Sequence, residues 1–348
     1  MSAAGEEQDI LFERRGALGL ITLNRPRALN ALTRAMCVAM RDRLSHWKAD
    51  KAIKTVAIRG AGDRAFCAGG DIRALYESGR AGTPYAIDFY RDEYRLNAAV
   101  KHFPKPYVAL LHGIVMGGGV GVSVHGSHRL ADTSAVFAMP ETGIGLFPDV
   151  GGSFFLPRLP GETGTYLALS GARLKAADLA YTGISTHTVP AAQWEELIGR
   201  LAGGDDVDGA LDGLSHLIEP PPLAEHRAEI DRYFSLQSVD AVLAALDAEG
   251  TVWAQAIAST IRAKSPTSLK VTLRQLREGR SLDFDACMRM EFRMVNRIIA
   301  GHDFYEGVRA TIIDKDDAPR WRPDALADVS DVDVTSYFAP LGDHELQS

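Results

Sequence analysis

The feature that most constrains the fold is a strand, a glycine-rich loop and a helix in succession, which the chain repeats three times. The loops read AGDRAFCAGGD at 61–71, HGIVMGGGVG at 112–121 and PETGIGLFPDVGG at 140–152. Short, mostly apolar runs at 55–59 and 107–111 precede the first two, and a small-residue helix from the second loop to His125 is expected. Such repetition predicts an open α/β fold with its ligand site at the carboxyl ends of the strands.

Simpler patterns predict the elements before the first of these units. Two apolar runs at 10–12 and 18–23 are separated by the turn-like RRG, which predicts a β-hairpin. Apolar residues then recur at helical spacing over 36–47. Asn30 or Thr33 can cap the helix that this spacing predicts.

Beyond about Gly183 the sequence changes character, and helices are predicted after a long loop. GGDDVDG and three consecutive prolines mark the stretch 203–222 as that loop. The helices are expected at 241–246, 252–261, 269–276 and 286–299, with Pro266 starting one of them. We therefore expect an α/β core at residues 8–202 and a helical C-terminal region at 203–348.

The composition excludes several classes of protein. With 348 residues, of which 46% are hydrophobic, the chain can bury a substantial core. It carries 45 acidic and 38 basic residues, and this net charge of −7 argues against a general nucleic-acid binder. An anionic small ligand is still compatible, because a few cations and backbone amides can hold a phosphate group.

Neither the cysteines nor the N-terminus indicates a disulfide framework, a zinc site or a targeting segment. Cys37, Cys67 and Cys287 lie far apart without CxxC spacing, and the histidines lack a metal-binding pattern. The stretch 107–126 is weakly polar, but its histidines and glycines fit a buried strand and helix better than a membrane span. Since the N-terminus, MSAAGEEQD, is acidic and has no apolar segment, we expect a cytoplasmic protein.

Two acidic residues make the third loop a candidate for chemistry. Glu141 and Asp149 lie eight residues apart, with no basic residue between them. In an apolar, glycine-rich loop, burial raises the pKa of a carboxyl group toward neutral pH, which suits general acid–base catalysis. A structural role stays open, because Asp149 could cap the helix starting near Gly151 and Glu141 could cap or pair elsewhere.

The first two loops offer backbone N–H groups. Adjacent glycines at 69–70 and 117–119 let the backbone approach a ligand closely, although a flexible turn is the alternative for the first loop. The second loop does not match GxGxxG, so a nicotinamide cofactor is not expected. The two loops could each aim one amide at a carbonyl oxygen and so form an oxyanion hole.

Four motifs in order carry a family resemblance. They are NRPRALNAL (24–32), FCAGGDI (66–72), HGIVMGGGVG (112–121) and FAMPETGIG (137–145), and the chain resembles the crotonase, or enoyl-CoA hydratase/isomerase, superfamily. Four more resemble its 3-hydroxyisobutyryl-CoA hydrolase branch: RDEYRLNAAV (91–100), GLFPDVGGSFFLPRL (145–159), SPTSLKVTLRQL (265–276) and GHDFYEGVRATIIDKD (301–316). The resemblance covers about residues 8–330. It implies a crotonase-like (ClpP/crotonase) ββα spiral core followed by the helical C-terminal region.

The resemblance also implies roles for the loops. The thioester oxygen of an acyl-CoA would accept hydrogen bonds from the backbone N–H groups of Gly70 and Gly118, and Gly118 would also contact the substrate. Glu141 would attack the thioester carbonyl, giving a mixed anhydride, or would activate water, and both routes stay open. Asp149 would bind the substrate hydroxyl or help activate the attack. Glu93 would help to bind the substrate.

One departure from the superfamily pattern bears on the reaction. A hydratase resembling this fold uses two glutamates, and the first of their positions is Gly121 here. The resemblance therefore implies hydrolysis of 3-hydroxyisobutyryl-CoA or a related short hydroxyacyl-CoA, as in valine degradation. An enoyl-CoA hydratase or isomerase is the alternative enzyme. A non-catalytic acyl-CoA-binding protein is the alternative of another class.

The remaining expectations concern ligands and partners. By analogy, CoA would lie along the backbone of Ala65, Ala68 and Ile72, with its phosphates held by cations such as Arg27 or Arg64. No metal or other cofactor is expected, since CoA is part of the substrate. The expected partner is the acyl-CoA, with no nucleic acid and no membrane. The superfamily also makes a homo-oligomer, a trimer or hexamer, possible.

Overall fold

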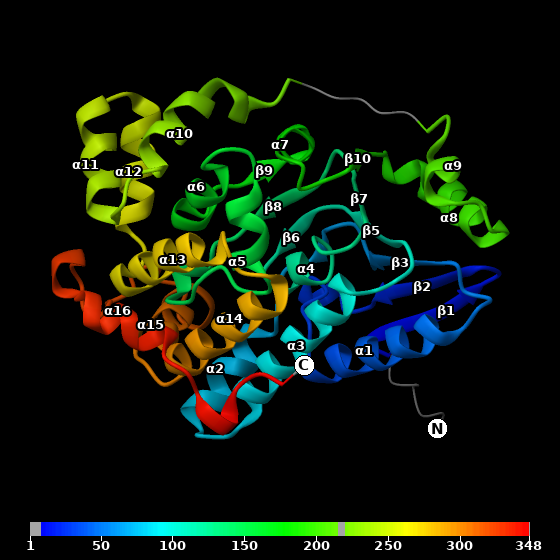
Figure 1. Ribbon diagram of the computed structural model, residues 1–348, viewed down its shortest axis with the longest axis horizontal. Coiled ribbons are helices and arrows are strands. Elements are labelled where there is room, and N and C mark those ends of the chain that lie inside the picture. Colours follow the sequence, from blue (N-terminus) through cyan, green and yellow to red (C-terminus); the bar gives the residue numbers. More distant parts are fainter. Residues whose placement is uncertain (1–7, 215–219, 348) are drawn as a thin grey trace.

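Two β-sheets organise the part of the chain that the structure, a computed structural model, describes, namely residues 8–214 and 220–347 (Figure 1). The larger sheet has the order β1-β2-β3-β5-β7-β10, formed by Ile10–Arg15, Leu18–Leu23, Thr55–Gly60, Tyr107–Leu111, His128–Ala131 and His187–Thr188. The smaller has the order β4-β6-β8-β9, formed by Ala65–Cys67, Ile114–Met116, Val136–Ala138 and Leu174–Lys175. Strands β1 and β2 pair antiparallel, which confirms the predicted hairpin.

The repeated unit places one strand in each sheet. Strands β3, β5 and β7 of the larger sheet run parallel, and each is followed by a strand of the smaller sheet, β4, β6 and β8. These three pair parallel as well, so their carboxyl ends lie at one edge. The helices that follow are α2 (Ile72–Arg80), α4 (Gly118–Gly121) and α5 (Gly152–Phe155). The stretches 61–71 and 112–121 were predicted as loops throughout, but each contains one of these short strands. The glycines that follow the three strands therefore leave the smaller sheet on the same side.

Helices cover both faces of the larger sheet. On one side lie α1 (Arg34–Ala49) and α3 (Tyr85–Lys101), which pack against each other. Thr33 caps α1 by accepting a hydrogen bond from the backbone N–H of Met36, whereas Asn30 binds loop backbone instead. On the other side α8 (Trp194–Gly203) packs on Leu18 and Leu20 of β2. Strand β2 is buried along its whole length because both of its faces are covered.

Two further local predictions also differ from the structure. Within the predicted loop, Val207–Leu211 forms helix α9, because Asp206 caps it and its apolar residues bury in the same cluster as α8. The rest of that loop includes 215–219, which lie outside the described residues. The helix after the second loop ends at Gly121 and does not reach His125. Glycine lends a helix little stability, so this segment has little to extend it.

The predicted C-terminal helices are all present, with longer bounds. They belong to the series α10 (Arg227–Phe234), α11 (Val239–Glu249), α12 (Val252–Arg262), α13 (Pro266–Gly279), α14 (Phe284–Ile299), α15 (Asp303–Val308) and α16 (Asp331–Phe338). Helix α13 starts at Pro266, and Ser265 caps it by accepting from the N–H of Ser268. Helices α6 (Thr163–Ser170) and α7 (Ala176–Thr182) precede the series.

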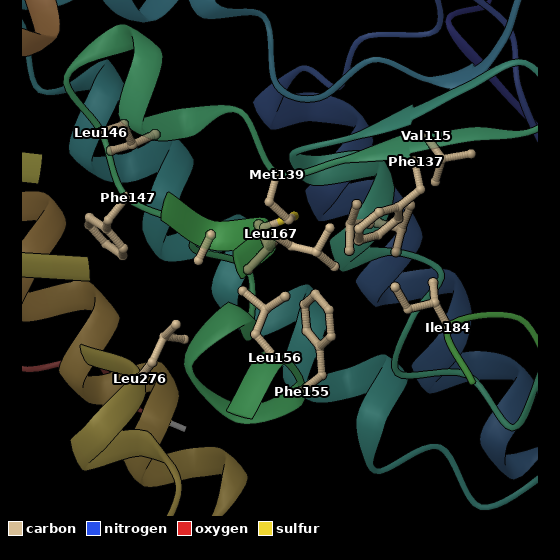
Figure 2. Packing of buried hydrophobic residues seen from close by; sticks show 14 of the residues in the cluster. Val115, Phe137, Met139, Leu146, Phe147, Phe155, Leu156, Leu167, Ile184 and Leu276 are labelled. Atoms are coloured by element: carbon tan, nitrogen blue, oxygen red, sulfur yellow. The ribbon is translucent and has the colours of Figure 1, made fainter. Parts of the chain in front are cut away.

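The main hydrophobic core joins the loops to these helices. Figure 2 shows Phe137 and Met139, which lead into the third loop, together with Phe155 and Leu156 just after it. Leu276 of α13 belongs to the same buried cluster. Helices α13 and α14 also contact α5 directly, and α14 contacts α3. The third loop is thus enclosed by elements that come from both halves of the chain.

The short helix α4 depends on a close backbone approach that a substitution can test. A Cβ atom on Gly119 would lie 2.3 Å from the carbonyl oxygen of Cys67, whereas one on Gly199 in α8 would meet nothing within 4 Å. We expect Gly119→Ala to lower the free energy of unfolding by about 2 kcal/mol or more. The control Gly199→Ala should keep or raise stability by up to about 1 kcal/mol.

Urea unfolding followed by circular dichroism measures both variants. Equal stability of the Gly119→Ala and Gly199→Ala proteins would contradict this packing of α4 on β4.

Candidate active site

One cavity of about 430 Å³ brings the three glycine-rich loops together. Its floor and walls come from these loops, from α2 and α3, and from segments that flank the C-terminal helices. Of the residues singled out in the sequence, it is lined by Ala68, Gly70, Ile72, Glu93, Gly118, Glu141 and Asp149. Residues more than 70 positions apart in the sequence thus share one site.

Three residues expected at the CoA subsite do not line this cavity. Ala65 lies inside β4, and its carbonyl oxygen accepts a hydrogen bond of 2.8 Å from Nδ2 of Asn30. Arg27 and Arg64 are exposed. The cations that do line the cavity are Arg173 and Lys264.

The first two loops present backbone donors to the cavity. Among the described residues, no protein acceptor binds the N–H of Gly70 or of Gly118. The residue before each donor is a glycine with positive φ, +117° at Gly69 and +49° at Gly117, which other residues rarely adopt. A Cβ on Gly118 would also lie 2.4 Å from Oε1 of Glu93. Glycine is therefore required for both the backbone turn and the close approach.

Asp149 is buried beside a tyrosine hydroxyl. The hydroxyl of Tyr94 in α3 donates a hydrogen bond of 2.9 Å to Oδ2 of Asp149. Burial raises the pKa of Asp149 to about 7, while the hydrogen bond from Tyr94 opposes this rise. The side chain does not cap α5, whose N-cap is Gly151. The capping role that the sequence left open is thus absent.

Glu141 and Glu93 are buried as well, and each has an oxygen without a partner among the described residues. Burial raises the pKa of Glu141 well above its usual range, the charge of Asp149 raises it further, and Lys264 opposes the rise. Burial likewise raises the pKa of Glu93, with smaller contributions from Asp149 and Glu291. The orphaned oxygens leave both carboxyl groups free to bind a ligand.

The loop that carries Asp149 has a strained backbone that α14 holds in place. Val150 has a φ of +51°, which is unfavourable for a β-branched residue. Glu291 of α14 accepts hydrogen bonds from the N–H groups of Gly151 at 2.8 Å and Ser153 at 2.9 Å, and from the Ser153 hydroxyl. Such strain persists only where surrounding contacts enforce it.

Two further side chains fix the same loop. Nε2 of Gln275 in α13 donates 2.7 Å to the carbonyl oxygen of Pro148, and Nε2 of His125 lies 2.7 Å from that of Val150. Sequence reasoning missed these contacts and those of Tyr94, Glu291 and Lys264. The motifs RDEYRLNAAV and SPTSLKVTLRQL contain Tyr94 and Gln275, but a motif does not show which side chains reach the loop.

The space beside Gly121 is already filled. A Cβ at this position would lie 2.6 Å from Nδ2 of Asn97 and 2.7 Å from Cβ of Val150. A second carboxylate could not be added there without moving α3 or the strained loop. The cavity therefore has Glu141 from the third loop and no acidic side chain from position 121.

Comparison with known proteins decides the family. A family model described as enoyl-CoA hydratase/isomerase matches residues 18–338. The chain belongs to the enoyl-CoA hydratase/isomerase family. Two solved structures share its fold. A carnitinyl-CoA dehydratase from Mycobacterium thermoresistibile is 42% identical, with 98% of this chain and 99% of that chain covered and a TM-score of 0.93. An enoyl-CoA hydratase from Rhodobacter sphaeroides 2.4.1 is 40% identical, with 98% of this chain and 100% of that chain covered and a TM-score of 0.92. The expected crotonase-like fold is confirmed.

Curated members of the family resemble the chain over nearly its whole length. The 3-hydroxyisobutyryl-CoA hydrolase of Danio rerio is 48% identical, covering 99% of this chain and 93% of the relative. The 3-hydroxyisobutyryl-CoA hydrolase of Homo sapiens is 44% identical, covering 98% of this chain and 91% of the relative. The resemblance to this hydrolase branch is therefore confirmed.

The same relatives correct the expected location. Their names describe them as mitochondrial, so the cytoplasmic location expected from the acidic N-terminus is wrong. That expectation rested on a short segment whose residues 1–7 lie outside the described part of the structure. Across the described ranges, no helix is both long and apolar enough to cross a membrane.

The burial of Asp149 makes a prediction about stability. A carboxyl group whose pKa rises from 3.8 to about 7 on folding binds its proton more tightly when folded, so it lowers stability as the pH rises through that window. Asp149→Asn removes this loss. The free energy of unfolding of Asp149→Asn minus that of the unmodified protein should therefore rise by at least ~1 kcal/mol between pH 5 and pH 8.

Urea unfolding at the two pH values provides the measurement. The exposed Asp324→Asn is the matched control and should show no such change with pH. A pH-independent difference for Asp149→Asn would show that burial does not destabilise the Asp149 carboxylate.

Proposed function

We propose that the chain hydrolyses the thioester of 3-hydroxyisobutyryl-CoA, or of a related short hydroxyacyl-CoA, to the free acid and CoA. The observation that carries this proposal is that Glu141 and Asp149 line a cavity together with Gly70 and Gly118, whose N–H groups have no acceptor in the described part of the chain. The names of the curated relatives support the substrate. With this substrate, the reaction would be a step of valine degradation.

The two backbone donors would bind the oxygen of the thioester. When a nucleophile adds to the carbonyl carbon, negative charge develops on that oxygen, and the N–H groups of Gly70 and Gly118 would stabilise it. Each donor of this kind typically contributes ~3 kcal/mol to stabilising the transition state. The donors are fixed before substrate arrives, because the positive-φ glycines set the loop conformation.

Glu141 would carry the reaction by one of two routes. As a nucleophile, its carboxylate adds to the carbonyl carbon, the C–S bond breaks, and water then hydrolyses the mixed anhydride. As a general base, it takes a proton from water while that water attacks the carbonyl carbon. In both routes the CoA thiolate leaves and takes up a proton. Burial raises the pKa of the Glu141 carboxyl group, which makes its carboxylate a stronger base.

The neighbouring groups would bind the rest of the substrate. Asp149 would accept a hydrogen bond from the hydroxyl of the acyl group, and Glu93 would help to hold the acyl group. CoA would extend along the backbone near Ala68 and Ile72, and Ala65 remains part of this proposed subsite. No step requires a metal or a redox cofactor. A trimer or hexamer, the absence of nucleic-acid binding, and the domain boundary near residue 203 remain predictions.

Hydration of an enoyl-CoA is the second candidate, because the two solved structures at 40% and 42% identity are described as a hydratase and a dehydratase. Its weakness is Gly121, where neighbouring atoms leave no room for a second carboxylate. A protein that binds acyl-CoA without turning it over would keep the cavity but would show no reaction.

An assay of two substrates separates these functions. Incubation with 3-hydroxyisobutyryl-CoA should release free thiol, and incubation with crotonyl-CoA should leave the double bond intact. We expect Glu141→Gln to lower kcat for thiol release at least ~100-fold, because the variant has neither a nucleophile nor a base at this position.

The matched control is Glu196→Gln, an exposed residue of α8 outside the cavity, which should keep full activity. Loss of the crotonyl double bond without thiol release would contradict the hydrolase and support the hydratase. No turnover of either substrate would leave only the binding protein.

A further inference from the structure

Tyr90 is a buried polar residue in the cavity to which neither the family motifs nor the proposed mechanism gives a role. It belongs to α3, it is 2% exposed, and it is among the residues that line the cavity. Its hydroxyl has no hydrogen-bond partner in the described part of the chain. A buried hydroxyl without a partner costs ~1–3 kcal/mol, so this one needs an explanation.

Two other buried tyrosine hydroxyls do have partners. Tyr94, one turn further along α3, donates to Asp149 at 2.9 Å. Tyr107 of β5 donates to the carbonyl oxygen of Val122 at 3.0 Å. The fold therefore provides hydrogen-bond partners for both of these buried hydroxyls. Tyr90 differs from them in lining the cavity, which suggests that its partner is a ligand.

Packing holds the Tyr90 ring in place. Its ring centroid lies 5.5 Å from that of Phe89 and 5.9 Å from that of Tyr94, in edge-to-face arrangements. Tyr90 and Glu93 are three residues apart on α3, so both side chains lie on the helix face that meets the cavity. A fixed hydroxyl beside a carboxyl group provides a preformed pair of one donor and one acceptor.

The Tyr90 hydroxyl and the Asp149 carboxylate, which both line the cavity, together suit one kind of ligand group. A hydroxyl group both donates and accepts hydrogen bonds, so its full recognition needs an acceptor and a donor. The carboxylate of Asp149 can only accept, and Tyr94 already donates to one of its oxygens. Tyr90 lines the same cavity, its ring packs against that of Tyr94, and its hydroxyl supplies a donor that no described residue uses.

We propose that the Tyr90 hydroxyl donates a hydrogen bond to the hydroxyl oxygen of the acyl group while Asp149 accepts the hydrogen of that same hydroxyl. Tyr90 is then a specificity-determining residue that favours hydroxyacyl over plain acyl thioesters. A plain acyl chain leaves the buried tyrosine hydroxyl without a partner, and sites of this kind discriminate strongly against the group that lacks the hydroxyl. The inference rests on the proposed function.

The test compares two thioesters that differ by one oxygen. Tyr90→Phe and the unmodified protein are assayed for thiol release from 3-hydroxyisobutyryl-CoA and from isobutyryl-CoA. We expect the variant to lose about tenfold in kcat/KM on the hydroxylated substrate, as for one lost hydrogen bond of ~1.4 kcal/mol, and nothing on isobutyryl-CoA. The preference between the two substrates therefore falls about tenfold.

Tyr107→Phe is the matched control, because it removes an equally buried hydroxyl that lies outside the cavity lining. It should lower Tm and leave the substrate preference unchanged. Equal losses of Tyr90→Phe on both thioesters, or no loss on either, would overturn the proposal. The first result would indicate a general effect on the site.

A binding measurement separates this inference from the proposed function. Thioether analogues of the two substrates cannot be hydrolysed, so calorimetry can measure the Kd of each analogue without turnover. The informative ratio is the Kd of the isobutyryl analogue divided by the Kd of the 3-hydroxyisobutyryl analogue. If Tyr90→Phe lowers that ratio in a protein that hydrolyses neither thioester, the role of Tyr90 stands and the hydrolase proposal fails. An unchanged ratio contradicts the role of Tyr90 whatever the activity.

Discussion

The burial of four carboxyl groups around one loop is the constraint on which the site depends. Glu93, Glu141, Asp149 and Glu291 are all at most 5% exposed, and burial is the largest cause of the raised pKa of each. Ionising any one of them makes ionising the next less favourable, so they titrate as a coupled set. Such an arrangement lowers stability, and carboxyl groups with strongly raised pKa values cluster at functional sites.

The C-terminal helices make this arrangement possible. Glu291 and Gln275 fix a loop whose strained Val150 would otherwise relax, and the loop then holds Asp149 against Tyr94 of α3. The hydroxyl of Tyr94, the carboxylate of Asp149 and the backbone donors of Gly70 and Gly118 are therefore positioned by elements that pack against one another. The C-terminal helices thus support the loop, and the segments beside them form part of the cavity wall. These two roles explain why the chain extends beyond the repeated units.

Sequence patterns predicted the fold and much of the cavity because local rules decide them. Glycine-rich loops after parallel strands must meet at one edge, so the loops bearing Gly70, Gly118 and Glu141 could be placed together. The helix α9 was missed because its signal is a capping Asp206 inside a stretch rich in glycine and aspartate. The contact between Glu291 and the third loop spans about 140 residues, and no local pattern encodes it. No motif of the sequence contains Tyr90, and only the fold shows that its hydroxyl has no partner among the described residues.

The most direct test of the proposed hydrolysis is a crystal structure of Glu141→Gln with 3-hydroxyisobutyryl-CoA bound. We expect the thioester oxygen to lie within hydrogen-bonding distance of the N–H groups of both Gly70 and Gly118, and the carbonyl carbon to face residue 141. We also expect the substrate hydroxyl to lie beside Asp149. An acyl group bound outside the cavity, or a thioester oxygen that contacts neither amide, would contradict hydrolysis at this site.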